Sequence, residues 1–281
     1  MELAHYLSTY RRDGIVQIET SFSQQLPSGL RMRALADEVC DYHTITSVTT
    51  HENIRFLRSG SDAVEVRKVE TRIENFVSTN HHWMDLCQTG GILSTIVGLV
   101  CAEDDGDSSP WCLYKEKLNI KPAGSSGFAP HLDSPSLRVT GLCDTFVTVM
   151  IAIDDMTVEN GCLQVCRGNW NETNSIPCEE PEITTEGQTN PDGNGRRGAI
   201  INGDGLNLLW KPVECMSGDI FIFSGWLPHR SSANASQLPR RAVFLTYNHS
   251  EDGELSETYY RMMRDMRADY LKQQVVDASQ K

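Results

Sequence analysis

The sequence lacks a long apolar run, a basic cluster and a paired cysteine motif. Its longest apolar window, around Gly91–Cys101, is far shorter than the ~20 residues that a membrane-spanning helix needs. Lysine and arginine total 25 against 38 aspartates and glutamates, which gives a net charge of −13. Contacts to phosphates need clustered positive charge, so we expect no nucleic-acid partner and no membrane partner.

The cysteines exclude a zinc finger and argue against a disulfide framework. There are nine of them, an odd number, and no CxxC pair. The first 14 residues lack the basic start and continuous apolar stretch of a signal peptide. We therefore expect a cytoplasmic protein with reduced, mostly buried thiols.

The sequence does contain a helical first part followed by many short strands. Helical periodicity occurs at 2–12, 31–40 and 90–101 and returns after residue 255, with a strand at 15–18. This order favours one mainly β domain over 1–281, a sandwich or jelly-roll barrel with helical buttresses. The expected parts are a helical buttress at about 1–110, a barrel core at about 111–250 and a C-terminal helix at about 255–275. The β-branched and aromatic runs of the core are 111–121, 145–153, 161–165, 219–223 and 242–247.

One segment departs from this pattern. Pro181–Gly205 is rich in glycine, asparagine, aspartate and threonine and poor in apolar residues. A loop of this length in a compact domain is either a functional lid or a disordered segment, and the sequence does not decide between them.

The strongest local signal for chemistry is the pair His131 and Asp133, two residues apart. Alternate side chains of an extended chain share a face, so the two project the same way. An imidazole and a carboxylate on one face can take two adjacent positions around iron(II), and a third ligand from elsewhere would complete a facial triad. On its own, such a pair is common by chance.

A second signal follows the apolar strand at 219–223. His229 lies just beyond this strand, and Arg240 begins the next one. The planar guanidinium of arginine can bind both oxygens of a carboxylate. Side-chain direction alternates along a strand, so Arg240 and Arg241 cannot both point inward, and the spacing favours Arg240. Each residue alone has an ordinary structural explanation, whereas their order predicts an iron site beside a carboxylate-binding arginine.

Six short motifs occur in order at Arg72–Phe76, Tyr114–Asn119, Phe128–Asp133, Glu159–Leu163, His229–Asn234 and Arg240–Ala242. Together they resemble the phytanoyl-CoA dioxygenase (PhyH) family of iron(II)/2-oxoglutarate-dependent oxygenases. The resemblance covers most of the chain. It implies a double-stranded β-helix, a cupin-like jelly-roll barrel with N-terminal and flanking α-helices.

The resemblance also implies residue roles. His131, Asp133 and His229 would be the catalytic metal ligands. An aspartate at position 133 favours hydroxylation, desaturation or a related oxidation, because halogenating relatives carry a small residue there. Lys117, Asn119 and Thr148 are equally well explained as ordinary strand residues. The residues implied to bind 2-oxoglutarate are Arg240, Ser231, Thr148, Asn119 and Lys117.

The function implied is that of an oxidoreductase. It would use iron(II), 2-oxoglutarate and O2 to oxidise a small or medium organic molecule, in specialised metabolism, as a homodimer. Arg138 and Arg230 are candidates for binding an anionic substrate group, although surface charge explains them as well. Trp210 and Trp226 are either an apolar wall of the site or packing residues.

Two alternatives stay open at this point. The first is an iron enzyme on the same scaffold that uses no 2-oxoglutarate, and the presence of Arg240 and Ser231 argues against it. The second is a binding protein without turnover. The intact triad argues against that interpretation, because an inactive relative is expected to lose metal ligands.

Overall fold

The computed structural model describes residues 2–19, 26–41, 48–57, 64–102, 108–138, 140–166, 200 and 208–265. Apart from Ile200, the segment Pro181–Gly205 lies outside these residues, so the lid prediction is not addressed by the structure.

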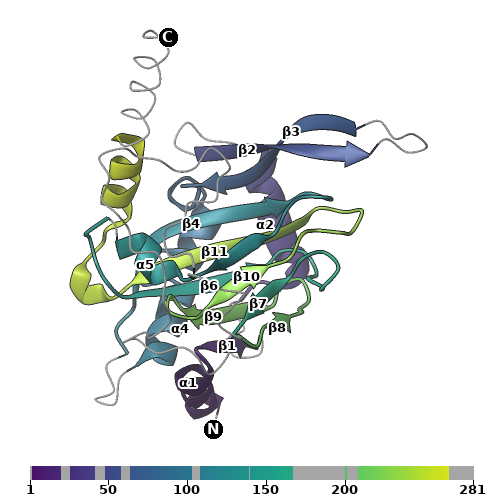
Figure 1. The fold of residues 1–281 in the computed structure, drawn as a ribbon. Helices are drawn as coiled ribbons and strands as arrows, with labels where there is room; N and C mark the ends of the chain where they lie inside the picture. Colours follow the sequence, from purple (N-terminus) through teal and green to yellow (C-terminus); the bar gives the residue numbers. More distant parts are fainter. Residues whose placement is uncertain are drawn as a thin grey trace.

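Two antiparallel sheets form the body of the molecule (Figure 1). The larger sheet has the order β1-β9-β6-β11-β4-β3-β2 and the smaller one β5-β10-β7-β8. The strands of the larger sheet are β1 (Ile15–Ile18), β2 (Val48–Leu57), β3 (Val64–Glu74), β4 (Cys112–Lys121), β6 (Phe146–Ala152), β9 (Ile220–Ser224) and β11 (Arg240–Asn248). Those of the smaller sheet are β5 (Phe128–His131), β7 (Leu163–Val165), β8 (Lys211–Val213) and β10 (His229–Ser231).

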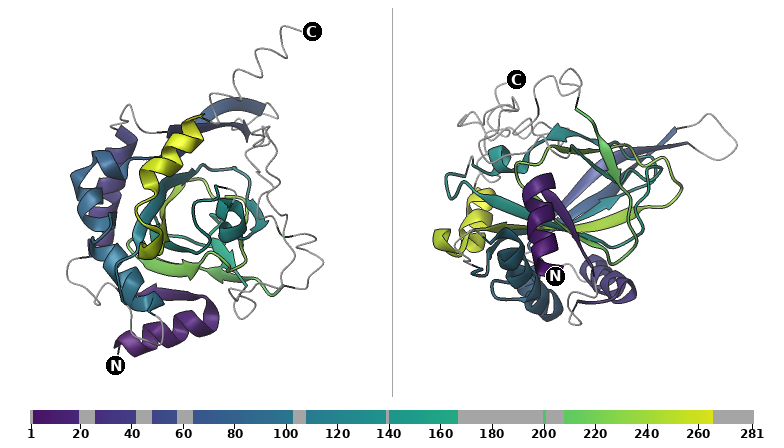
Figure 2. Two further views of the ribbon diagram at one scale, coloured as in Figure 1. Left: turned by 90° about the vertical axis from the view of Figure 1, so that its left-hand side faces the viewer. Right: turned by 90° about the horizontal axis from the view of Figure 1, so that it is seen from below.

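Helices cover the outer face of the larger sheet, and the strands enclose the barrel interior on its other face (Figure 2). A further helix at 256–265 lies beside the barrel. The named helices are α1 (Glu2–Asp13), α2 (Gly29–Asp41), α3 (His81–Cys87), α4 (Ile92–Cys101) and α5 (Asp133–Arg138), with 3-10 turns η2 (Val77–Thr79) and η3 (Ser250–Asp252).

Strand β6 shows why the interior of the barrel is distinct from the helical core. All seven of its residues are buried, as expected for a strand covered on both faces. Val149 and Ile151 belong to the core beneath the helices, whereas Met150 and Ala152 belong to the cluster inside the barrel. Because side chains alternate along a strand, one face of β6 packs in the core beneath the helices and the other face points into the barrel interior.

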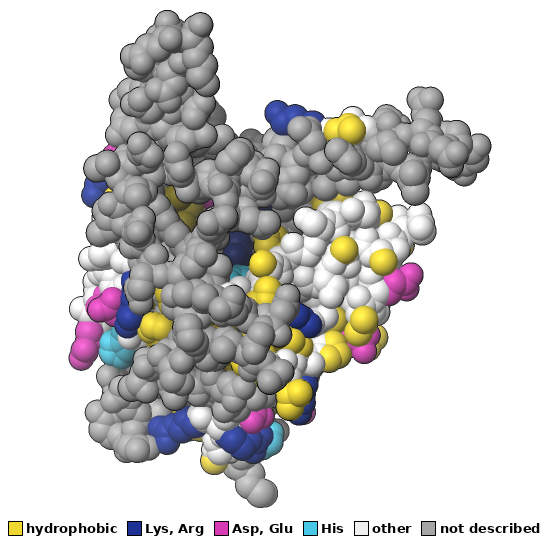
Figure 3. Space-filling model, viewed as in Figure 1, with side chains coloured by type: hydrophobic (Ala, Val, Ile, Leu, Met, Phe, Trp, Pro, Cys, Tyr) yellow, Lys and Arg dark blue, Asp and Glu magenta, His cyan; other side chains and the backbone are white. Residues whose placement is uncertain are grey.

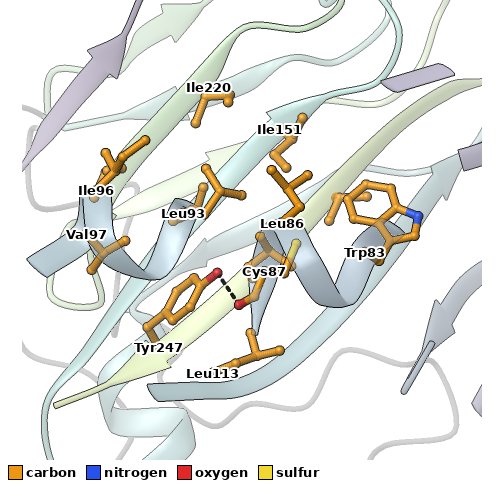
Figure 4. Packing of buried hydrophobic residues seen from close by; sticks show 14 of the residues in the cluster. Trp83, Leu86, Cys87, Leu93, Ile96, Val97, Leu113, Ile151, Ile220 and Tyr247 are labelled. Carbon is orange, nitrogen blue, oxygen red and sulfur yellow. Dashed lines mark hydrogen bonds between the residues drawn. The ribbon is translucent and has the colours of Figure 1, made fainter. Parts of the chain in front are cut away.

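The core under the helices is closed by α3 and α4 (Figure 4). Asn80 caps α3, since its side-chain oxygen accepts from the backbone N–H groups of His82 and Trp83. The hydroxyl of Tyr247 on β11 donates to the carbonyl of Cys87 at 2.8 Å, which pairs a polar group inside the core.

The predicted class, mainly β with N-terminal and flanking helices, is confirmed. The first 110 residues are less helical than expected, because the hairpin of β2 and β3 extends the larger sheet. The alternation of apolar and charged residues in β3, from Val64 to Glu74, is the strand signal that helical periodicity elsewhere in this region obscured.

The stretch His81–Cys101 meets the length and composition of a membrane span. In this structure it is two helices, α3 and α4, whose Trp83, Leu93 and Val97 are buried in the core. Eight cysteines lie in the described residues; all are free and none is exposed, as predicted, and Cys178 lies outside them.

Candidate metal centre

His131, Asp133 and His229 converge at one point between the two sheets. Their ligand atoms all lie within 4.8 Å of one another. His131 ends β5 and is the direct cross-strand partner of His229, the first residue of β10. From Oδ1 of Asp133, Nε2 of His131 lies 3.8 Å away and Nε2 of His229 lies 3.7 Å away. Two imidazoles and one carboxylate are the donor set of non-haem iron(II) oxygenases.

Backbone hydrogen bonds hold both imidazoles in the same tautomer. Nδ1 of His131 donates to the carbonyl of Ala129 at 2.8 Å, and Nδ1 of His229 donates to that of Leu227 at 2.9 Å. A carbonyl only accepts, so Nδ1 carries the proton and the Nε2 lone pair faces the other ligands.

Thr148 on β6 orients the carboxylate. Its hydroxyl donates to Oδ2 of Asp133 at 3.1 Å, which leaves Oδ1 toward the two histidines. Partners of this kind behind a ligand fix its orientation and raise metal affinity.

The electrostatics of the triad suit a cation. Burial in the barrel, together with the charge of His229, lowers the pKa of His131 to about 3, so its lone pair is free at neutral pH. Burial alone would raise the pKa of Asp133, but the electrostatic effects of His229 and Lys117 lower it below its ordinary value. The triad therefore offers a carboxylate and a neutral imidazole without prior deprotonation.

The local backbone differs from the extended segment that the sequence suggested. Strand β5 ends at His131, and Asp133 is the first residue of α5. The reason is visible in the sequence, since a carboxylate and then Pro135 suit the first turn of a helix. The two side chains converge although they lie on different elements.

Arg240 and Lys121 form a cationic pair inside the barrel. They are cross-strand partners on β11 and β4, and both are buried. Nη2 of Arg240 donates to the carbonyl of Gly161 at 2.5 Å, and Nζ of Lys121 donates to Oγ of Ser231 at 2.9 Å and to the carbonyl of Ser232.

The surroundings of this pair fit a dicarboxylic co-substrate. Nε of Arg240 is buried without a hydrogen-bond partner, and no described carboxylate forms an ion pair with Arg240 or Lys121. Burial and the charge of Arg240 lower the pKa of Lys121 to about 7. A buried cation without a counter-charge is costly, and a bound carboxylate would offset that cost.

The neighbouring Arg241 faces the opposite way. It forms ion pairs with Asp154 at 2.9 Å and Asp37 at 2.5 Å on the helical side of the sheet. These bonds raise the pKa of its guanidinium above its usual range. Of the two consecutive arginines, only Arg240 points into the barrel.

The other residues with an expected co-substrate role are spread along the interior. Lys117 and Asn119 are half-buried on β4, and Oδ1 of Asn119 has no hydrogen-bond partner. Thr148 lies behind the carboxylate of Asp133. Sequence reasoning did not single out Lys121, although it shares the strand parity of Lys117 and Asn119 and is the register partner of Arg240.

Both arginines considered for an anionic substrate group have partners of their own. Arg138 bonds to Asp144 at 3.2 Å and stacks on Trp226. Arg230 bonds to Gln164 at 2.8 Å and stacks on Trp210. The tryptophans therefore serve as cation–π platforms for these two arginines.

Comparisons with known proteins agree with this geometry. The family model described as phytanoyl-CoA dioxygenase (PhyH) matches residues 10–242. Among solved structures, that of EctD from S. alaskensis with 2-oxoglutarate and 5-hydroxyectoine aligns with a TM-score of 0.59. It covers 89% of this chain and 77% of that one at 17% identity, so it supports the fold.

Two curated relatives carry names of phosphonate-oxidising enzymes. A 2-aminoethylphosphonate dioxygenase from the uncultured bacterium HF130_AEPn_1 is 29% identical over 212 residues, which is 75% of this chain and 71% of the relative. A methylphosphonate hydroxylase from Gimesia maris is 37% identical over 151 residues, 54% of this chain and 50% of the relative.

The family match extends over more than half of the chain and includes all three residues of the candidate metal site. The predicted oxidoreductase class, with iron(II) and 2-oxoglutarate as cofactor and co-substrate, is confirmed at the level of the family. The chain belongs to the phytanoyl-CoA dioxygenase family.

Proposed function

We propose that this protein is an iron(II)/2-oxoglutarate-dependent dioxygenase that oxidises a C–H bond of a small organic molecule. One observation carries the proposal: three potential ligand atoms within 4.8 Å of one another lie in a barrel whose interior also holds Arg240, a buried arginine with which no described carboxylate forms an ion pair. That combination suits a metal ion and a dicarboxylate bound together.

In this proposal His131, Asp133 and His229 hold the iron. When bound, iron(II) supplies oxidation of the substrate by O2 while 2-oxoglutarate is decarboxylated to succinate. The donor set fits this use, because three protein ligands leave positions open for co-substrate and oxygen.

Arg240 would bind the far carboxylate of 2-oxoglutarate. Ser231 supports it, since its Oγ already accepts from Lys121 and from the backbone N–H of Phe128, at 3.3 Å, and its own hydrogen is left to donate. Lys121 contributes a second positive charge. We assign Thr148 to the orientation of Asp133, and Lys117 and Asn119 to the wall of the site.

Apolar side chains from β6 and β9 exclude water from the site. Met150, Phe221 and Phe223 are buried inside the barrel, and the ring of Phe223 lies 5.3 Å from that of His229. A dry wall strengthens the attraction between Arg240 and a bound carboxylate.

The biological setting is part of the proposal. We propose a single domain over 1–281 that acts in the cytoplasm on a small-molecule substrate, as a homodimer, without nucleic-acid or membrane partners. The free cysteines and the net charge of −13 support this setting. The names of the two relatives make phosphonates of specialised metabolism the first substrates to test.

The test is a substrate screen of iron-loaded enzyme, read out as succinate formed when a candidate is added. We expect His131→Ala and His229→Ala to abolish succinate formation and leave the melting temperature of the apo protein nearly unchanged. His81→Ala, an exposed histidine at the start of α3, is the matched control and should retain activity. Unchanged succinate formation in either triad variant would remove the metal assignment.

A further inference from the structure

A second group of cations lies on the interior face of the larger sheet, apart from Arg240 and Lys121. Register pairs Arg72 of β3 with Asn119 of β4, and Glu74 with Lys117, so these side chains share one face. Lys115 has the same parity on β4. We call Arg72, Lys115 and Lys117 the basic wall.

The basic wall has few partners. Among the described residues neither lysine ammonium makes a hydrogen bond or an ion pair. Nζ of Lys117 lies 5.2 Å from the ring centre of Phe244, and Nζ of Lys115 lies 5.6 Å from that of Tyr259. Arg72 reaches Glu74 only at 3.8 Å, and its Nε is buried without a partner.

The basic wall is next to the metal ligands. Asp133 acts electrostatically on both Lys115 and Lys117, and so do Arg72 and Glu74. In the space-filling view, basic atoms and a histidine lie side by side near the centre of one face, set back behind the surrounding atoms (Figure 3). A molecule held by the basic wall would therefore lie beside the iron.

Charge balance indicates what that molecule carries. Among the described residues, three cations face two carboxylates, Glu74 and Asp133, and Asp133 is assigned to an iron ion that adds two positive charges. Burial opposes the charged form of both lysines and lowers the pKa of Lys117 to about 8. Concentrated cations in a poorly solvated site are costly unless an anion binds there.

We propose that the basic wall binds an oxyanion group of the substrate, such as a phosphonate or phosphate, and thereby positions the neighbouring carbon at the iron. This inference rests on the proposed function for the position of the iron. An arginine and two lysines from adjacent strands offer several charge-assisted donors, which is the usual recognition of tetrahedral oxyanions.

The experiment measures binding rather than turnover. Anaerobic enzyme with Mn(II) in place of iron is titrated calorimetrically with 2-oxoglutarate, and the binary complex is then titrated with methylphosphonate, inorganic phosphate or the uncharged dimethyl methylphosphonate. We expect the two anions to bind and the neutral ester not to bind.

Substitutions in the basic wall then locate the anion. Arg72→Gln and Lys115→Gln should each weaken methylphosphonate binding about tenfold or more, the loss of one charge-assisted hydrogen bond, and leave 2-oxoglutarate affinity unchanged. Lys68→Gln removes an exposed cation on the same strand and is the matched control. Arg72→Lys and Lys115→Arg keep the charge and should retain binding, which separates a lost contact from a misfolded variant.

The outcomes separate the two proposals. Tight 2-oxoglutarate binding without anion binding, or anion affinity that changes with Arg240→Ala rather than with Arg72→Gln, would overturn the basic wall and leave the dioxygenase proposal intact. Failure of the Mn(II) protein to bind 2-oxoglutarate would overturn the proposed function, whatever the phosphonate result.

Discussion

The two ends of β4 carry the same kind of side chain in different surroundings. At one end Lys121 is held by Ser231 and Ser232, and its partner Arg240 by the carbonyl of Gly161. At the other end Lys115 and Lys117 contact aromatic rings and make no described hydrogen bond. A preorganised pair suits a co-substrate that is the same in every turnover, whereas less constrained cations suit the variable partner, the substrate.

Of the substitutions that distinguish the two ends of β4, replacement of Arg240 should have the largest effect on 2-oxoglutarate binding. Arg240→Ala removes the charge that faces the far carboxylate, so we expect the Kd for 2-oxoglutarate to rise on the order of 100-fold, as for truncation of a buried charged contact. Calorimetry on the anaerobic Mn(II) protein gives the value, and methylphosphonate affinity should stay within twofold. A matching loss in Arg241→Ala instead would mean that the register of β11 is shifted by one residue.

Thr148 on β6 is level with Lys115, because both pair with Thr246 of β11, but its hydroxyl contacts Asp133 rather than a cation. Thr148→Val removes the hydrogen bond to Oδ2 of Asp133 and keeps the side-chain volume. We expect metal affinity to fall about tenfold, as for other partners behind metal ligands. Mn(II) titration measures this loss, and Thr148→Ser, which keeps the hydroxyl, should restore most of it.

The pH dependence of 2-oxoglutarate binding tests the role of Lys121, at the end of β4 where the cations are held by hydrogen bonds. Lys121 has a pKa of about 7 because of burial and Arg240, with a small opposing effect of Cys162. A bound dicarboxylate favours the ammonium form, so binding at pH 8 should take up protons and affinity should weaken severalfold between pH 7 and 9. Calorimetry in buffers of different ionisation enthalpy counts the protons.

Lys121→Met supplies the control for that measurement. It should bind 2-oxoglutarate more weakly at pH 7 and lose most of the pH dependence above it. A wild-type affinity that stays flat from pH 7 to 9 would contradict the role of Lys121.

The smallest effect is expected on the other face of β11. Arg241→Ala breaks the ion pairs with Asp154 and Asp37, of which the latter is largely exposed. The free energy of unfolding should fall by about 1 kcal/mol, a value near the upper end for such pairs. Urea denaturation measures it, and an unchanged Kd for 2-oxoglutarate would separate this face from the barrel interior.

Local patterns predicted much of the fold because the core strands are strongly apolar. The residues of β6 and β9 appear in the sequence as largely apolar runs; β6 lies within the strand expected at 145–153, and β9 ends one residue beyond the strand expected at 219–223. The hairpin of β2 and β3 was missed, because the helical periodicity of neighbouring segments outweighed the alternation of apolar and charged residues in β3.

The sequence alone predicted only part of the site. The alternation at Arg240 and Arg241 is a local fact that a strand period can expose. The spacing of His131 and Asp133 identified the pair, although Asp133 begins α5 and does not continue β5. Lys121 acquires its importance from its register with β11, a pairing across more than 100 residues that no local pattern specifies. The same holds for the basic wall, which exists only because β3 pairs with β4.

The centre is divided between the two halves of the barrel. His131 and His229 belong to the smaller sheet, whereas Thr148, Lys121 and Arg240 belong to the larger one. In the proposed site the three metal ligands come from the smaller sheet and the adjoining α5, whereas Thr148 and the two cations that would hold 2-oxoglutarate come from the larger sheet. A bound 2-oxoglutarate would therefore contact both sheets at once, and we expect it to hold the two halves of the barrel together and to slow the loss of bound Mn(II).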